Sequence, residues 1–147
     1  MKRSLRYILF YAALLFVLLA CSKGNASTDH NSSGGPHVVT PTDTTPPEVS
    51  IFTPTINQVF SNGGVINITG RITDDFGLYR GTIRVVNDAN GTVLMNQAYE
   101  IHGLLLYNFS INHSVSALAA ADYTIVVSFE DHGLNSTTKS VKVKVTP

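Results

Sequence analysis

Residues 122–133 read DYTIVVSFEDHG, and their apolar side chains recur at every second position. In an extended strand, alternate side chains project to the same face of the sheet. The spacing therefore places one apolar set on a single face, made of Tyr123, Ile125, Val127 and Phe129. This stretch predicts a β-strand that is buried on one side.

The same period of two continues along residues 48–147, where short apolar runs are separated by turn residues every 8–15 positions. Seven strands are predicted, around residues 49–51, 66–72, 83–85, 93–99, 107–111, 123–129 and 141–145. Asn90-Gly91 predicts a two-residue type I′ hairpin, because both residue types tolerate a positive φ. Seven short strands, each apolar on one side, predict an all-β antiparallel sandwich of two sheets.

The first 20 residues have the layout of an export signal. Residues 1–6 carry three basic side chains, and residues 7–20 are apolar and uncharged. A helix of these 14 residues would be about 21 Å long, whereas the hydrocarbon core of a bilayer is about 30 Å thick. We therefore predict a cleaved signal peptide over residues 1–20 and not a transmembrane helix.

Residues 18–21 read LLAC, which resembles the lipobox of bacterial lipoproteins. An aliphatic residue three positions before the cysteine and the small Ala20 carry the resemblance, although Leu19 is bulkier than the usual occupant. The resemblance implies cleavage after Ala20 and attachment of diacylglycerol, with fatty acids such as palmitate, to Cys21. Two or more acyl chains would hold the protein to a membrane. We expect no cofactor besides this modification, and no intrachain disulfide, because Cys21 is the only cysteine.

Residue 22 is serine and not the aspartate that retains lipoproteins in the inner membrane of enteric bacteria, so we expect an outer-membrane location. Whether the domain lies on the periplasmic or the external side of that membrane stays undecided. Residues 21–47 are rich in Ser, Thr, Asn, Gly and Pro and predict a disordered tether, because they bury too little apolar surface to offset ordering entropy. Asp43-Thr44-Thr45 resembles the O-glycosylation signal of exported Bacteroidota proteins, which implies a glycan on Thr44. Such a triplet also occurs by chance in a Thr-rich segment.

Several motifs in residues 48–147 resemble those of a known type of domain. Leu118 precedes Tyr123 by five positions, a spacing that resembles the tyrosine corner of immunoglobulin-like and fibronectin-type sandwiches. Residues 122–133 resemble the penultimate strand and following turn of bacterial Ig-like domains, and residues 45–49 resemble their opening. Together these features resemble the Bacteroidota lipoproteins that carry one C-terminal Ig-like domain of unknown function. The resemblance implies an Ig-like fold and brings no catalytic residues with it.

Four aspartates at the ends of predicted strands are candidate metal ligands: Asp74, Asp75, Asp88 and Asp131. Calcium prefers six to eight oxygen ligands, which acidic loops can supply. Aspartate also favours turns for local reasons, and we favour that interpretation. A zinc site would instead need His102, His113 and His132 to converge.

Charge and motifs restrict the function further. Without the signal peptide, seven basic residues face ten acidic ones, and this net charge of −3 argues against a nucleic-acid partner. No Gly-x-Ser-x-Gly motif is present, and the lipid consumes the only cysteine, so we do not expect an enzyme.

The leading hypothesis is a membrane-tethered, non-catalytic interaction module of the bacterial cell envelope, with a protein or glycan ligand that the sequence does not identify. One alternative is a glycan-capture accessory lipoprotein of a polysaccharide-uptake system, in which Tyr79, Tyr99 and Tyr107 would stack on sugar rings. Another is a calcium- or zinc-binding envelope protein. No sequence feature indicates an oligomeric state.

Overall fold

The computed structural model describes residues 39–147. The predicted cleavage after Ala20 and the lipidation of Cys21 lie outside the described residues. Within residues 39–147 no helix is long and apolar enough to cross a membrane. The described part contains the strands β1 (Glu48–Thr53), β2 (Val59–Ser61), β3 (Val65–Thr73), β4 (Leu78–Asn87), β5 (Val93–Glu100), β6 (Leu106–Ser114), β7 (Ala121–Asp131) and β8 (Ser136–Thr146).

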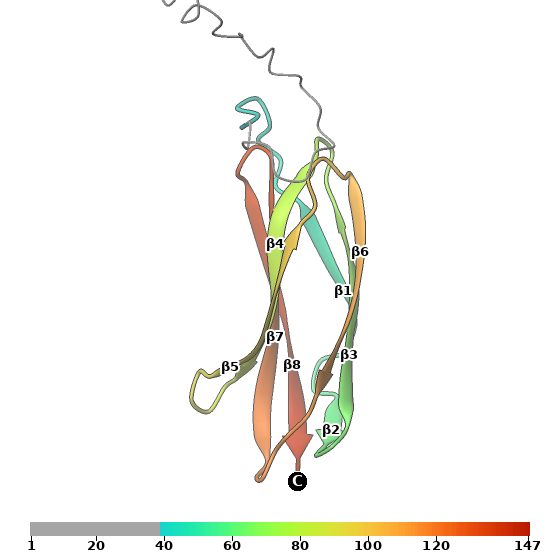
Figure 1. Ribbon diagram of the computed structural model, residues 1–147, viewed down its shortest axis with the longest axis vertical. Helices are drawn as coiled ribbons and strands as arrows, with labels where there is room; N and C mark the ends of the chain where they lie inside the picture. The colour runs from blue at the N-terminus through green and yellow to red at the C-terminus, as the bar shows by residue number, and fades with distance from the viewer. Residues whose placement is uncertain (1–38) are drawn as a thin grey trace, which may run out of the picture.

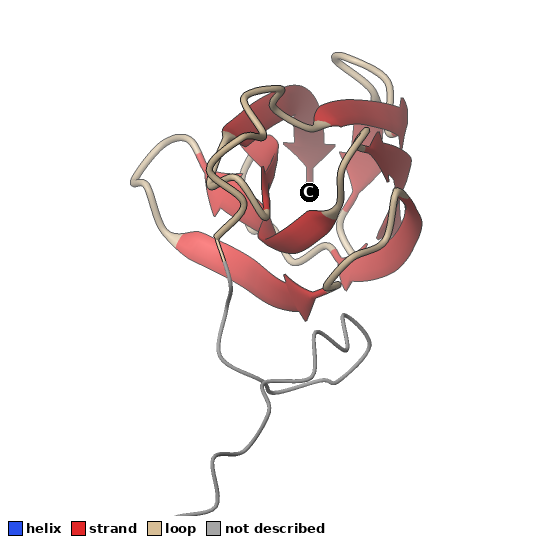
Figure 2. Ribbon diagram, turned by 90° about the horizontal axis from the view of Figure 1, so that it is seen from above, coloured by secondary structure: helices blue, strands red, loops and turns tan. Residues whose placement is uncertain are grey.

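The strands form two sheets that pack face to face (Figure 1). One sheet has three strands in the order β1-β3-β6, and the other has five in the order β2-β8-β7-β4-β5. Seen from above, the strands enclose the interior of the molecule (Figure 2). Neighbouring strands are antiparallel, except that β2 runs parallel to β8. The predicted all-β, Ig-like sandwich is confirmed.

The core lies between the sheets and consists of the inward-facing side chains of alternate positions. The fully buried members are Val49, Ile66, Ile68, Ile72, Leu78, Ile83, Val85, Ile125, Val127 and Val143. Each sheet also pairs a glycine with a buried aromatic residue on the neighbouring strand, Gly70 with Phe109 and Gly81 with Phe129. A Cβ atom at either glycine would overlap the ring of its partner, so the two rings fill the space that the glycines leave.

The structure differs from the sequence-based expectation at two local points. It adds an eighth strand, β2, whose three residues pair with residues 144–146 of β8 after the chain has crossed from one sheet to the other. The β4–β5 hairpin forms, but its turn is not type I′. Gly91 has a φ of 70°, whereas Asn90 is not among the described non-glycine residues with positive φ. The hairpin loop spans residues 88–92 instead of two residues.

The segment before β1 belongs to the folded domain. The Thr40 amide donates a hydrogen bond to the carbonyl oxygen of His132 at 2.9 Å. Asp43 and Pro47 are buried. The predicted boundary, with a disordered tether through residue 47 and a domain from residue 48, is therefore wrong for residues 40–47.

Candidate functional site

The loops of the sandwich gather at two ends (Figure 1). At the end where residue 39 enters, which we call the tether pole, residues 39–47 meet the β3–β4, β5–β6 and β7–β8 loops. Backbone hydrogen bonds join these loops, from the Asp74 amide to Leu105 and from the His132 amide to Gly77, at 2.9 and 3.0 Å. At the opposite end, the distal pole, the β2–β3, β4–β5 and β6–β7 loops lie near the C-terminus. These two poles hold the candidate sites.

Three carboxylates from separate parts of the chain converge at the tether pole. Asp43 precedes β1, Asp74 follows β3, and Asp131 ends β7. One oxygen of each lies within 4.8 Å of one oxygen of each of the others. Asp131 is fully buried and Asp43 is 7% exposed. The structure thus brings together two of the four predicted metal ligands and adds a third carboxylate that sequence reasoning placed in the tether.

Hydrogen bonds from neighbouring amides hold these carboxylates in place. The Asp74 side chain accepts from the amides of Phe76 and Gly77 within its own turn. Asp131 accepts from the Asn135 backbone amide at 2.9 Å and from the Asn135 side-chain amide at 3.0 Å. The same Asn135 side chain donates to the carbonyl oxygen of Asp43 at 3.1 Å. Asn135 therefore links the segment before β1 to the end of β7.

The other two predicted ligands do not join this cluster. Asp75 is exposed beside Asp74 and is not part of the three-carboxylate group. Asp88 lies at the distal pole, in the β4–β5 loop. Its two oxygens already have partners: Thr124 Oγ1 donates to Oδ1 at 2.6 Å, and Lys142 Nζ donates to Oδ2 at 2.8 Å. The prediction of Asp88 as a metal ligand is therefore not supported, because a lysine neutralises its charge.

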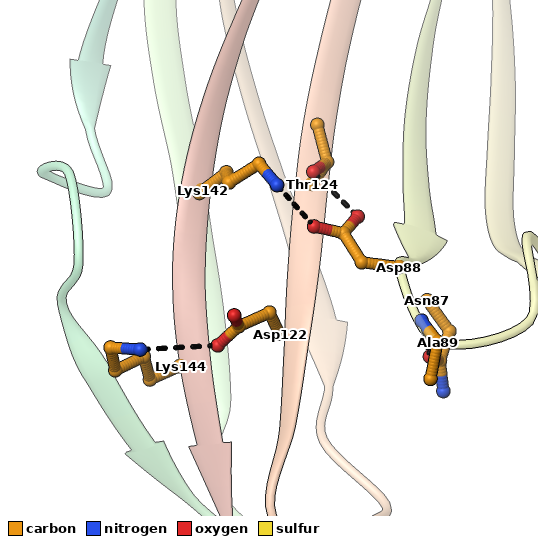
Figure 3. Close-up of polar contacts among 7 residues, drawn as sticks. All are labelled: Asn87, Asp88, Ala89, Asp122, Thr124, Lys142 and Lys144. Atoms are coloured by element: carbon orange, nitrogen blue, oxygen red, sulfur yellow. Dashed lines mark hydrogen bonds and ion pairs between the residues drawn. The ribbon is translucent and has the colours of Figure 1, made fainter.

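The distal pole carries a set of paired charges (Figure 3). Asp88 reaches from its loop to Thr124 on β7 and Lys142 on β8, and the Lys144–Asp122 ion pair lies nearby at 3.3 Å. The hydrogen bond from Lys142, followed by that from Thr124, lowers the pKa of Asp88 below its usual value. These contacts join the β4–β5 loop to the two neighbouring strands and form a structural network.

An Asp88→Asn variant is expected to be less stable than the wild type at pH 7, by an amount that disappears in acid. A carboxyl group with a lowered folded-state pKa stabilises the protein above its unfolded value of 3.8, and this contribution is lost as pH falls through the folded pKa. Urea unfolding of both proteins between pH 3 and 7 measures the difference. A gap that stays constant down to pH 3 would show that the ionised carboxylate is not responsible.

Tyr123 makes the hydrogen bond typical of a tyrosine corner, whereas Leu118 takes no part in the motif. The Tyr123 side chain is 2% exposed, and its hydroxyl donates to the carbonyl oxygen of Ser116 at 3.2 Å. This bond ties β7 back to the loop that precedes it. Leu118 is 99% exposed, so its side chain does not pack against Tyr123. The assignment of Leu118 to the corner is wrong.

Aromatic and histidine side chains form packed groups. Tyr79, His102 and His132 lie together at the tether pole, with ring centroids 4.7–5.4 Å apart. Tyr99 stacks edge-on against Tyr107 at 5.7 Å, and both pack against the core. The three tyrosines therefore do not form the exposed stacking surface that the glycan-capture alternative required. His113 lies on β6, away from the β5–β6 and β7–β8 loops that carry the other two histidines.

Comparisons with known proteins do not assign the chain to a family. No protein-family description and no curated protein matches the sequence. Among solved structures, the chain is similar to the fibronectin(III)-like modules of Clostridium thermocellum CbhA, with 22% identity and a TM-score of 0.44 over 69% of this chain and 47% of that one. It is also similar to the CARDB domain of a Pyrococcus furiosus protein in complex with di-metal ions, with 15% identity and a TM-score of 0.40 over 69% of this chain and 96% of that one. The chain thus spans about half the length of the first of these structures.

Proposed function

We propose that this chain is a lipid-anchored, non-catalytic interaction module of the bacterial cell envelope, held at the outer membrane through Cys21. The lipobox-like sequence before Cys21 supports the anchor, and the Ig-like fold suits a module that contacts partners through its loops. The observation that carries the proposal is the position of residue 39, the first described residue, which lies at the tether pole. The distal pole lies at the other end of the long axis (Figure 1).

The distal pole supplies a surface for a partner. Leu118, in the β6–β7 loop, exposes 99% of its area, and it is followed by the exposed Ala119 and Ala120. A large apolar side chain at the tip of a loop contributes nothing to the core, and burying it against another protein would be favourable. We assign the partner contact to this loop, at the end of the domain opposite to residue 39.

The anchor and the contact can be tested together in cells. We expect the full-length protein to incorporate labelled palmitate and to sediment with membranes, whereas a Cys21→Ala variant would lose the label and leave the membrane fraction. A photo-crosslinking residue at position 118 is expected to give a discrete adduct in the lipidated protein. The matched control carries the same residue at position 75, which is exposed at the tether pole.

Two results would contradict the proposal. If the wild type takes up no more palmitate than Cys21→Ala, the anchor assignment is wrong. If the protein is lipidated but position 118 gives no more adduct than position 75, the distal pole is not the contact surface.

A further inference from the structure

Three carboxylates lie close together at the tether pole, and no basic side chain among the described residues pairs with them. Asp43, Asp74 and Asp131 place one oxygen each within 4.8 Å of the others. No lysine or arginine in residues 39–147 forms an ion pair with any of them, because the ion pairs of Lys and Arg go to Glu130, Asp88 and Asp122. Three carboxylates so close together repel one another strongly unless a proton or a cation intervenes.

Two oxygens in the cluster also lack a hydrogen-bond donor. Asp43 Oδ1 accepts from the Thr45 amide at 3.2 Å, but Asp43 Oδ2 is buried and has no hydrogen-bond partner. The same is true of Asp74 Oδ2. Since Asp43 is 93% buried, water does not readily solvate its carboxylate. A buried acceptor that stays unsatisfied is costly, and such groups in folded proteins usually have an ion or a water as partner.

The electrostatics of Asp43 agree with this description. Its burial raises the pKa of the carboxyl above the usual value. The hydrogen bond from the Thr45 amide opposes this rise, and the nearby charges of Asp131, Asp74 and Asp75 add to it.

We propose that Asp43, Asp74 and Asp131 form a calcium site that fastens the segment before β1 to the β3–β4 and β7–β8 loops. Calcium–oxygen distances are about 2.3–2.6 Å, so oxygens on opposite sides of the ion lie about 5 Å apart. The separations of up to 4.8 Å in the cluster fit this span. The donors are all carboxylate oxygens, which suit a hard cation, and calcium tolerates the irregular geometry of ligands drawn from three loops.

The site would control where the folded domain begins. Without the ion, residues 39–47 are held by hydrogen bonds such as Thr40 amide to His132 and Asn135 side chain to Asp43. With it, one ligand from the entering chain and two from the body of the domain share one cation. Calcium would then fix the position of residues 39–47 against the sandwich. This inference does not depend on the lipid anchor or on the contact at Leu118.

The test uses the purified full chain in detergent, stripped with a chelator and then titrated with calcium chloride. Extracellular calcium modules bind with dissociation constants of about 10⁻⁴–10⁻³ M. In 5 mM calcium we therefore expect the melting temperature to rise by about 5–10 °C, with heat of binding in calorimetry. Calcium is also expected to slow proteolytic cleavage within residues 39–47.

Asp43→Asn and Asp74→Asn are the decisive variants. Asparagine keeps an oxygen acceptor, for example for the Thr45 amide, but removes one negative charge. Without calcium, Asp43→Asn is expected to melt no lower than the wild type, which shows that it folds, and neither variant should respond to calcium. Asp88→Asn is the matched control, because Asp88 is paired with Lys142 at the distal pole, and it should keep the full calcium response.

Three outcomes would overturn the proposal. One is a wild type that shows neither a melting shift nor a heat of binding in 10 mM calcium. Another is an Asp43→Asn variant that retains the wild-type shift. The third is an equal shift with magnesium at the same concentration, which would mean that the cluster does not select for calcium.

Discussion

Replacing Phe129 with alanine is expected to lower the free energy of unfolding by about 3–5 kcal/mol. Phe129 is 1% exposed and lies in β7, the strand that pairs with both β4 and β8. Its ring covers the space above Gly81 and lies 5.8 Å from the ring of Tyr99. Glycine has no side chain with which to fill the vacated volume, so the variant would keep a cavity. A domain of this size is stable by about 5–15 kcal/mol, so the loss is a large share of the total.

Urea unfolding measures this loss as a lower midpoint with an unchanged slope. Phe52→Ala is the matched control, because Phe52 is 54% exposed at the end of β1. Its truncation is expected to change stability by no more than about 0.5 kcal/mol. Equal losses in the two variants would contradict the assignment of Phe129 to the core.

The parts of the fold that could be predicted are those set by local periodicity. The alternation in residues 122–129 determines which side chains share a face, and Tyr123, Ile125 and Val127 are indeed at most 2% exposed. Alternation carries this information because a strand has a fixed period of two, whatever it pairs with. The strands β3, β6 and β8 repeat the alternation over several residues, so the sequence predicts their apolar faces in the same way.

The eighth strand could not be predicted because it has no pattern of its own. β2 contains only three residues, and of these Val59 and Ser61 are exposed. Its extended form depends on parallel pairing with residues 144–146, far away in the sequence. Short strands of this kind are products of the tertiary structure, and a local reading of composition assigns them to a loop.

For a similar reason, the sequence predicts two members of the carboxylate cluster and misses the third. Asp74 and Asp131 follow strands directly, and this position marked them as candidates. Asp43 lies among Ser, Thr and Pro residues whose composition indicates a tether, yet it is buried against a loop 92 positions away, where Asn135 donates to its carbonyl oxygen. Composition averages over a segment, whereas docking depends on single residues that meet a partner. Asp88 is the opposite case: the sequence predicts it as a metal ligand, but in the structure it forms an ion pair. Its partner Lys142 lies 54 positions away, so the sequence around Asp88 does not indicate this pair.

Replacing Gly70 with alanine is expected to destabilise the protein by about 2–3 kcal/mol, the upper part of the range for overpacking. In an ordinary strand the same change is favourable by about 0.5–1 kcal/mol, because glycine loses more conformational freedom on folding. Here a Cβ atom would overlap both the Phe109 ring and the carbonyl oxygen of Ser50. The ring could turn, but the carbonyl belongs to the backbone of β1, which pairs with β3. The three-stranded sheet must therefore shift as a unit.

Gly91→Ala separates this packing effect from the general cost of replacing a glycine. Gly91 has a φ of 70° in the β4–β5 loop, and a Cβ atom there would meet nothing within 4 Å. Its replacement should cost about 1 kcal/mol from the left-handed backbone alone. Urea unfolding of both variants gives the comparison. If Gly70→Ala is as stable as the wild type, the Phe109 ring and the Ser50 carbonyl do not pack tightly against Gly70. The description of the three-stranded sheet would then have to be revised.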